Sequence, residues 1–248
     1  MNGVRLAVSW LTVLPVRGPE EVDRAVAGRA IGWAPLVGVL LGAGAAGSLW
    51  GLGELGASGL LAGFVVVAGL ALITRGMHID GLADTMDGLG SYGPPERARE
   101  IMKSGGAGPF GVAALVFALG IQAVSLGALA ANSRWLAVVI AVAVGRVAVV
   151  LAGRRGIDAA PGAGFGALVA GTQHPALGFV WGGIACLAAI FATGNPWQGP
   201  LAVFVALAAS MLLARHCVRR FGGLNGDVLG AALEVSVTIA AAVLSFAR

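Results

Sequence analysis

Long apolar runs constrain the fold of this 248-residue chain more than any other feature. Several of them reach the roughly 18 to 20 residues that a helix needs to cross a bilayer. With 58% hydrophobic and only 11% charged residues, the composition is typical of an integral membrane protein. We therefore predict an all-α, polytopic transmembrane helical bundle. The predicted spans are 32–50, 57–75, 109–131, 135–153, 175–193, 197–214 and 228–246.

The whole chain, 1–248, is predicted to form one integral membrane domain with two notable segments outside the spans. The first segment, 1–31, has Arg5 ahead of an apolar stretch, as a signal peptide does, but no small-residue cleavage site follows. We predict an interfacial or re-entrant helix there. The second segment, 76–108, carries an acidic motif and then a short charged helix that begins at Pro95.

Basic residues are distributed unevenly between the two sides that these spans define. Of the 16 Lys and Arg residues, thirteen fall on the amino-terminal side, two fall on the other side, and Arg146 lies within a span. Because basic residues accumulate in cytoplasmic loops, we predict that the amino terminus and the acid-rich segments face the cytoplasm and that the carboxyl terminus lies outside. The basic balance then reflects topology and contact with membrane lipid, and no nucleic-acid partner is predicted.

Three carboxylates lie close together where an apolar run ends. Asp80, Asp84 and Asp87 are spaced i, i+4, i+7, so on a helix they share one face, with about 5 to 6 Å between neighbouring Cβ atoms. Such carboxylates repel one another unless a cation lies among them. Oxygen ligands suit Mg²⁺ or Mn²⁺, which usually serve substrate phosphates. The alternative is a structural ion-pair network in which Asp84 or Asp87 contacts Arg97 or Arg99.

A second acidic block opens the last predicted span. Asp227 ends the glycine-rich segment 222–227, and Glu234 follows on the same helix face, about 10 Å into the apolar region at 1.5 Å per residue. A carboxylate at that depth is costly and indicates function. We predict Asp227 as a fourth metal ligand and Glu234 as a supporting residue that is protonated or has a partner such as Arg146. The plainer alternative is a Glu234 hydrogen-bonded to a nearby Ser or backbone.

A second loop, 153–166, is rich in glycine and carries Arg154 and Arg155. Backbone amides and two guanidiniums in such a loop suit a phosphate group. Paired arginines at a cytoplasmic helix end are equally well explained by membrane topology. Both interpretations stay open at the level of sequence.

Several segments, in order along the chain, resemble the cobalamin synthase family. They are Leu11-Thr12-Val13-Leu14-Pro15-Val16, Pro35-Leu36-Val37-Gly38, His78-x-Asp80-Gly81-Leu82-Ala83-Asp84-x-x-Asp87-Gly88, Ile101-Met102-Lys103 with Gly108-Pro109-Phe110-Gly111, and Gly222-Gly223-x-Asn225-Gly226-Asp227 with Glu234. The resemblance covers residues 9–240. It implies a Mg²⁺-dependent transferase of the cell inner membrane that joins adenosylcobinamide-GDP to alpha-ribazole, or its 5'-phosphate, and releases GMP.

The resemblance also implies roles for single residues. Metal would be held by Asp80, Asp84, Asp87 and Asp227, and substrate by Lys103, Asn225, Arg154 and Arg155. Asp87 and His78 are both candidates for the base that takes the proton of the attacking hydroxyl, and the sequence does not choose between them. One departure is that Ser104-Gly105-Gly106-Ala107 stands where the family pattern has an acid. Either that acid is dispensable here or this copy is impaired.

Two rival functions share the membrane setting. A CDP-alcohol phosphotransferase would also carry clustered Asp-Gly pairs, but there Ala-Arg is expected where this chain has Ala83-Asp84. An ion-coupled transporter would also keep acids such as Glu234 within the membrane, and internal inverted symmetry would favour it, but no convincing repeat is found. The sequence leaves open whether the chain works as an oligomer.

Overall fold

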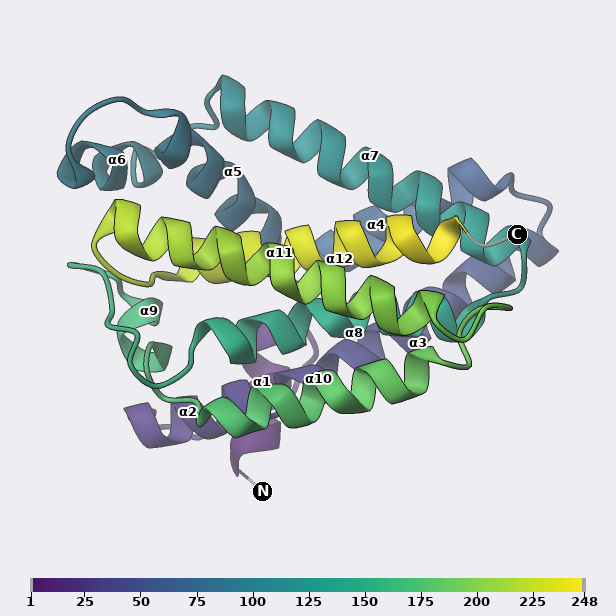
Figure 1. Cartoon of the computed structure of the whole chain (residues 1–248), viewed down its shortest axis with the longest axis horizontal. Helices are drawn as coiled ribbons and strands as arrows, with labels where there is room; N and C mark the ends of the chain where they lie inside the picture. Colours follow the sequence, from purple (N-terminus) through teal and green to yellow (C-terminus); the bar gives the residue numbers. More distant parts are fainter. Residues whose placement is uncertain (1, 247–248) are drawn as a thin grey trace.

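The computed structural model describes residues 2–246, and its regular elements are α-helices (Figure 1). The long helices are α3 (Ala34–Glu54), α7 (Pro109–Ala131), α8 (Trp135–Ala152), α11 (Gln198–Phe221) and α12 (Gly226–Ser245). The shorter helices are α1 (Asn2–Leu11), α2 (Arg24–Gly32), α4 (Gly59–Ile73), α5 (Met77–Gly90), α6 (Pro95–Met102), α9 (Phe165–Val169) and α10 (Pro175–Ala189). The predicted all-α fold is confirmed.

The seven predicted spans correspond to seven of these helices, but not all of them are long enough to cross a membrane alone. Five helices qualify by length and apolar composition within the described residues, and the bent pair α4 and α5 would make a sixth. The apolar helix α10 has 15 residues, so at 1.5 Å per residue it spans about 22 Å, less than the roughly 30 Å of a hydrocarbon core. The count of seven spans is therefore approximate.

Helix α11 extends beyond its predicted span. The apolar pattern predicted an end at residue 214, whereas the helix continues through Arg215, Arg219 and Arg220 to Phe221. Arginine is a good helix former, so a polar extension prolongs the helix after the apolar run has ended. The helix then stops at Gly222, which adopts φ +77 in the left-handed region.

A sharp turn separates the apolar helix α4 from the acidic helix α5. The two axes differ by 92°, and the turn passes through Arg75 and Gly76, both with positive φ. The Arg75 guanidinium donates to the carbonyl oxygens of Ser9 and Thr12, each at 2.7 Å, and so ties the turn to the end of α1. Helix α5 is thereby directed away from the axis of α4.

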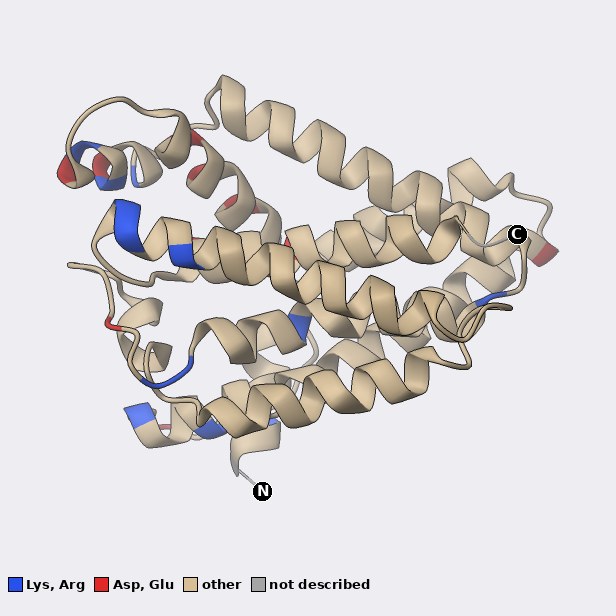
Figure 2. Ribbon diagram, viewed as in Figure 1, with Lys and Arg blue, Asp and Glu red and all other residues tan. Residues whose placement is uncertain are grey.

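Most of the charged residues lie at one end of the bundle (Figure 2). We call this the polar end; it contains α5, α6, α9 and the connections 12–23, 91–94 and 153–174. The opposite end, which we call the far end, contains the connections 55–58, 132–134 and 190–197 and carries Glu54 and Arg134. Helix α1, ten residues long, is too short to cross and buries Leu6 and Leu11 beside α3 at the polar half.

Candidate functional site

The acidic helix α5 packs directly against the start of α12. A Cβ on Gly81 would lie 2.8 Å from the carbonyl oxygen and 2.9 Å from the Cα of Asp227, so only glycine allows this approach. A Cβ on Gly230 would lie 3.0 Å from the carbonyl oxygen of His78. These two contacts bring Asp80 beside Asp227, although 147 positions separate them in the sequence (227 minus 80).

The carboxylates on α5 and α12 influence one another strongly. Burial, followed by the negative charges of Asp80, Asp227 and Asp87, raises the pKa of Asp84 to about 6. Within residues 2–246, the side chains do not gather three or more His, Cys, Asp or Glu groups tightly enough to hold a metal ion as they stand. Mg²⁺ needs only one or two protein carboxylates beside water and substrate phosphate, so this donor set fits it.

Asp87 has a different environment from Asp80 and Asp84. Its Oδ2 accepts from the backbone N–H of Gly108 at 2.6 Å, and its Oδ1 accepts from that of Gly111 at 2.9 Å. A Cβ on Gly108 would lie 2.6 Å from Oδ1, and one on Gly111 would collide with Oδ2. The side chain is 8% exposed. Asp87 therefore binds the amino-terminal amides of α7, where the helix dipole favours a negative charge.

Asn225 caps α12 and orients its neighbour Asp227. Its Oδ1 accepts from the backbone N–H of Val228 at 2.9 Å, and its Nδ2 donates to Asp227 Oδ2 at 3.2 Å. The preceding residue, Leu224, is fixed by backbone hydrogen bonds to Asp158 and Ala160, at 2.8 and 2.9 Å. The loop after α8 thus holds the start of α12 in place.

Two adjoining cavities meet at Phe165, Gly226 and Asp227. The larger, about 350 Å³, is lined by Trp10, Phe165, His78, Arg146, Asp80 and Asp227 among others, and we call it the aromatic cavity. The smaller, about 200 Å³, is lined by Arg99, Lys103, Asn225 and Asp227 among others, and we call it the basic cavity.

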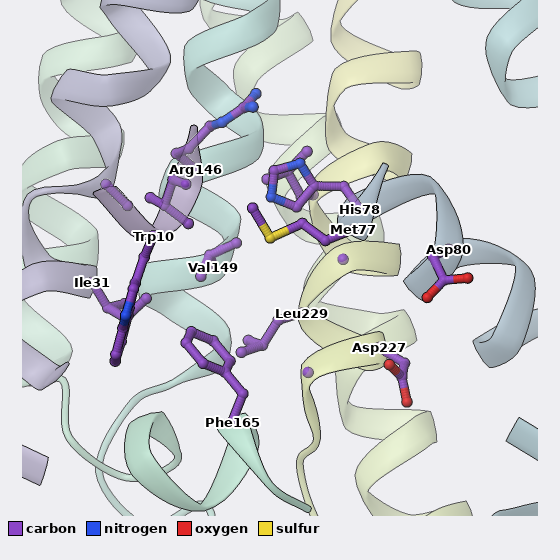
Figure 3. Close-up of a pocket in the computed structure, with 15 residues that line it drawn as sticks. Trp10, Ile31, Met77, His78, Asp80, Arg146, Val149, Phe165, Asp227 and Leu229 are labelled. Atoms are coloured by element: carbon purple, nitrogen blue, oxygen red, sulfur yellow. The ribbon is translucent and has the colours of Figure 1, made fainter. Parts of the chain in front are cut away.

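Figure 3 shows how the aromatic cavity is arranged. The Trp10 and Phe165 rings lie on one side of the α12 ribbon, and the carboxylates of Asp80 and Asp227 lie on the other. The two rings meet edge to face, with centroids 5.0 Å apart. His78 projects from the start of α5 toward the cavity, below the guanidinium of Arg146. One cavity therefore offers an apolar aromatic wall and an acidic wall.

The structure brings only some of the predicted substrate-binding residues to this site. Lys103 and Asn225 line the basic cavity beside Asp227. Arg154 instead donates to the carbonyl oxygen of Leu151 at 3.1 Å and lines a different, apolar groove. Arg155 lines a separate cavity of about 620 Å³ near α2 and α10. Neither arginine lines the aromatic or the basic cavity.

The described residues do not form the alternative ion-pair network, in which Asp84 or Asp87 would contact Arg97 or Arg99. Arg97 pairs with Glu100 at 3.1 Å and Arg99 with Glu96 at 2.9 Å, both within α6. Arg99 also donates to the carbonyl oxygen of Phe221 at 2.7 Å. The charged helix α6 is therefore internally paired and fastened to α11, and Arg99 still borders the basic cavity.

Glu234 lies in a buried polar network next to the site. Gln122 on α7 donates from Nε2 to Glu234 Oε2 at 2.8 Å and to Thr238 Oγ1 at 3.0 Å. Arg146 lines the same small void as Gln122 and Glu234 and is 4% exposed. Glu234 was expected to be protonated or to have a partner such as Arg146, and its direct partner is Gln122. The sequence did not indicate Gln122, because an uncharged residue within an apolar run carries little signal.

A helical membrane bundle with acidic and basic groups at two adjoining cavities at its polar end has the form of a polytopic membrane enzyme. The chain matches the family described as cobalamin-5-phosphate synthase over residues 3–245, and it belongs to that family. A Corynebacterium efficiens protein named adenosylcobinamide-GDP ribazoletransferase is 39% identical over 97% of this chain and 90% of its own. Proteins of that name from Frankia casuarinae and a Nocardioides species are 40% and 39% identical, over 95% and 98% of this chain and 91% and 97% of theirs. No solved structure matches.

Proposed function

We propose that this chain is an adenosylcobinamide-GDP ribazoletransferase. It would join adenosylcobinamide-GDP to alpha-ribazole, or its 5'-phosphate, to give adenosylcobalamin, or its 5'-phosphate, and GMP. The observation that carries the proposal is the contact between the acidic helix α5 and the Asn225–Asp227 turn, which unites both acidic blocks of the family pattern at one pair of cavities. The names of the relatives support the same reaction.

We propose Asp80, Asp84 and Asp227 as the residues that hold Mg²⁺. The ion would neutralise the substrate diphosphate, which otherwise meets a site made of carboxylates. Asp87 would support the site without binding the metal directly, because both of its carboxylate oxygens already accept from backbone amides of α7. It would thereby fix α5 against α7. Asn225, as the cap that donates to Asp227, would keep that carboxylate in position.

The basic cavity is the proposed place for the leaving nucleotide's phosphate. Lys103 donates from Nζ to the carbonyl oxygen of Gly162 at 3.2 Å, which holds its ammonium over the cavity beside Asp227. Arg99 is held by Phe221 and Glu96 and adds a second positive charge. Fixed cations of this kind stabilise the charge that builds up on a departing phosphate.

Of the two candidates for the base, His78 is better placed than Asp87. His78 lines the aromatic cavity, and Asp87 does not. His78 is 7% exposed and lies near the Arg146 guanidinium, so a neutral ring that accepts a hydrogen bond from the attacking hydroxyl is favoured over a second cation. In phosphoryl transfer most of the catalysis comes from positioning and charge stabilisation, so this base would contribute modestly.

The activity test uses the purified chain in lipid nanodiscs with Mg²⁺, adenosylcobinamide-GDP and alpha-ribazole. We expect GMP and the cobalamin product in equal amounts, measured by chromatography and mass spectrometry. CMP release from a CDP-alcohol, with no GMP from the corrinoid, would support the lipid-enzyme rival instead. Ion-gradient-driven uptake into proteoliposomes without GMP release would support the transporter rival.

We further propose that the polar end faces the cytoplasm of a bacterial inner membrane, with lipid around the apolar helices. The observation behind this is the collection of basic residues at that end (Figure 2). In a background with both native cysteines replaced, Cys at Ser91 should react with an impermeant maleimide only from the cytoplasmic side, and Cys at Ala57 only from outside. The reverse labelling would overturn the orientation. Mass photometry of the same nanodiscs would report whether the chain is an oligomer.

A further inference from the structure

The aromatic cavity is built from parts of the chain that the acidic motifs do not supply. Trp10 comes from α1 and Phe165 from α9, and the two rings meet edge to face with centroids 5.0 Å apart. Ile31, Val149 and Leu229 complete an apolar wall. Rings that lie at the edge of an open cavity, beside aliphatic side chains, offer a stacking surface to a planar ligand.

We propose that the aromatic cavity binds the base of the attacking nucleoside, an apolar benzimidazole, and that Trp10 and Phe165 determine the specificity for it. This rests on the proposed function. Asp80 and Asp227 also line this cavity, across α12 from the two rings (Figure 3), so a nucleoside whose base lies against the rings directs its ribose toward the acidic wall. The attacking hydroxyl is on that ribose.

Size excludes the corrinoid from this cavity. The cavity measures about 350 Å³, at the lower end of the roughly 300–1,000 Å³ of small-molecule sites. A corrin macrocycle with its side chains is several times larger than a bicyclic base. Only the diphosphate arm of the corrinoid substrate therefore reaches Asp227, and the ring system stays outside.

Polarity disfavours the other base in the reaction. Guanine carries several donors and acceptors, and burying them against Trp10, Phe165 and Leu229 would leave most of them without partners. A dimethylbenzimidazole riboside has one free acceptor nitrogen and no donor on its base. The apolar wall of Trp10, Phe165 and Leu229 therefore suits this base better than guanine.

The test measures both substrates in variants of the aromatic wall. Phe165→Ala should raise the KM for alpha-ribazole roughly tenfold or more, as expected when a stacking partner is lost, and leave the KM for adenosylcobinamide-GDP unchanged. Phe165 is 38% exposed on a short surface helix, so its removal should not unfold the bundle. Trp10→Phe should keep most of the affinity and Trp10→Ala should lose it. The matched control is Phe117→Ala, since Phe117 is 69% exposed on α7 and lines neither cavity.

Unchanged KM values for alpha-ribazole in Phe165→Ala and Trp10→Ala, or a rise only for the corrinoid nucleotide, would overturn the inference. Equilibrium dialysis of alpha-ribazole against the same proteins, without the second substrate, separates the inference from the proposed function. Binding that weakens in Phe165→Ala, with no GMP formed by the wild type, would leave the base site standing and reject the transferase. GMP formation by the wild type, together with alpha-ribazole binding that is unchanged in Phe165→Ala and Trp10→Ala, would support the transferase and reject the base site.

Discussion

At the far end of the bundle glycines let helices pack backbone to backbone, whereas at the polar end they make room for carboxylates. Gly63 on α4 faces the backbone of Ala123 on α7, and Gly127 faces Gly59, so closely that a side chain would collide. Gly108 and Gly111 at the start of α7 instead face the carboxylate of Asp87. Glycines at the start of α7 therefore make room for a carboxylate of α5, and glycine further along α7 allows close packing against α4 in lipid.

The difference teaches that glycine content alone does not locate a site. Far-end glycines contact Ala, Gly and backbone, and the surrounding buried cluster consists of Ala, Val, Leu and Ile side chains such as Leu49, Val66 and Leu126. Three polar-end glycines instead face aspartates: Gly81 faces the backbone of Asp227, and Gly108 and Gly111 face the carboxylate of Asp87. Changes at the two ends should therefore separate stability from activity.

The largest expected effect is the loss of a carboxylate at the polar end. Asp80→Asn and Asp227→Asn should each lower kcat by about 10³-fold or more, because the charge that opposes the diphosphate is then poorly neutralised. Thermal unfolding should change little, since removing one of several repelling charges does not weaken the fold. The matched far-end change, Glu54→Gln at the exposed end of α3, should leave GMP release unaltered. Near-normal turnover by Asp80→Asn at limiting Mg²⁺ would contradict the proposed difference in function between the polar end and the far end.

The second effect compares three glycine-to-alanine changes. Gly111→Ala should lower stability by about 1–3 kcal/mol through overpacking, and should also lower kcat by roughly 10- to 100-fold, as misplaced supporting groups do at metal sites. Gly63→Ala should cost similar stability and leave the kcat of folded protein intact. Gly120→Ala, on the same α7 with open space around it, should change neither. Equal kcat values for Gly111→Ala and Gly63→Ala would remove the distinction.

A third, smaller effect concerns the buried network between the two ends. Glu234→Gln should lower the free energy of unfolding by roughly 1–3 kcal/mol, because a buried hydrogen-bonded acceptor is altered, while kcat stays within a few-fold of wild type. The reason is that Glu234 lines neither the aromatic nor the basic cavity. Unfolding midpoints and GMP release rates check both parts. A fall in kcat comparable to that of Asp80→Asn, at unchanged stability, would place Glu234 in the chemistry.

Sequence patterns predict the acidic half of the site better than the aromatic half. Helical spacing already indicates that Asp80 and Asp84 share one face, and the glycine-rich turn separately singles out Asp227, since each signal is local. Trp10 and Phe165 come from segments 155 positions apart (165 minus 10), and only the tertiary fold brings them into contact. Span ends were also uncertain, because helix α11 continues with arginines that no longer look like membrane residues.

The smallest effect is a pH dependence confined to the polar end. Burial and the charges of Asp80, Asp227 and Asp87 raise the pKa of Asp84 to about 6, against about 3.9 in an unfolded chain. Between these values the folded state binds more protons than the unfolded state, so without metal this group makes stability fall as pH rises. Bound Mg²⁺ would offset the repulsion only where Asp84 is ionised. The rise in unfolding temperature on adding Mg²⁺ should therefore be larger at pH 7.5 than at pH 5, by roughly 2–4 °C for about 1 kcal/mol, and Asp84→Asn should remove that difference. An equal Mg²⁺ effect at both pH values in the wild type would show that Asp84 does not sense the ion.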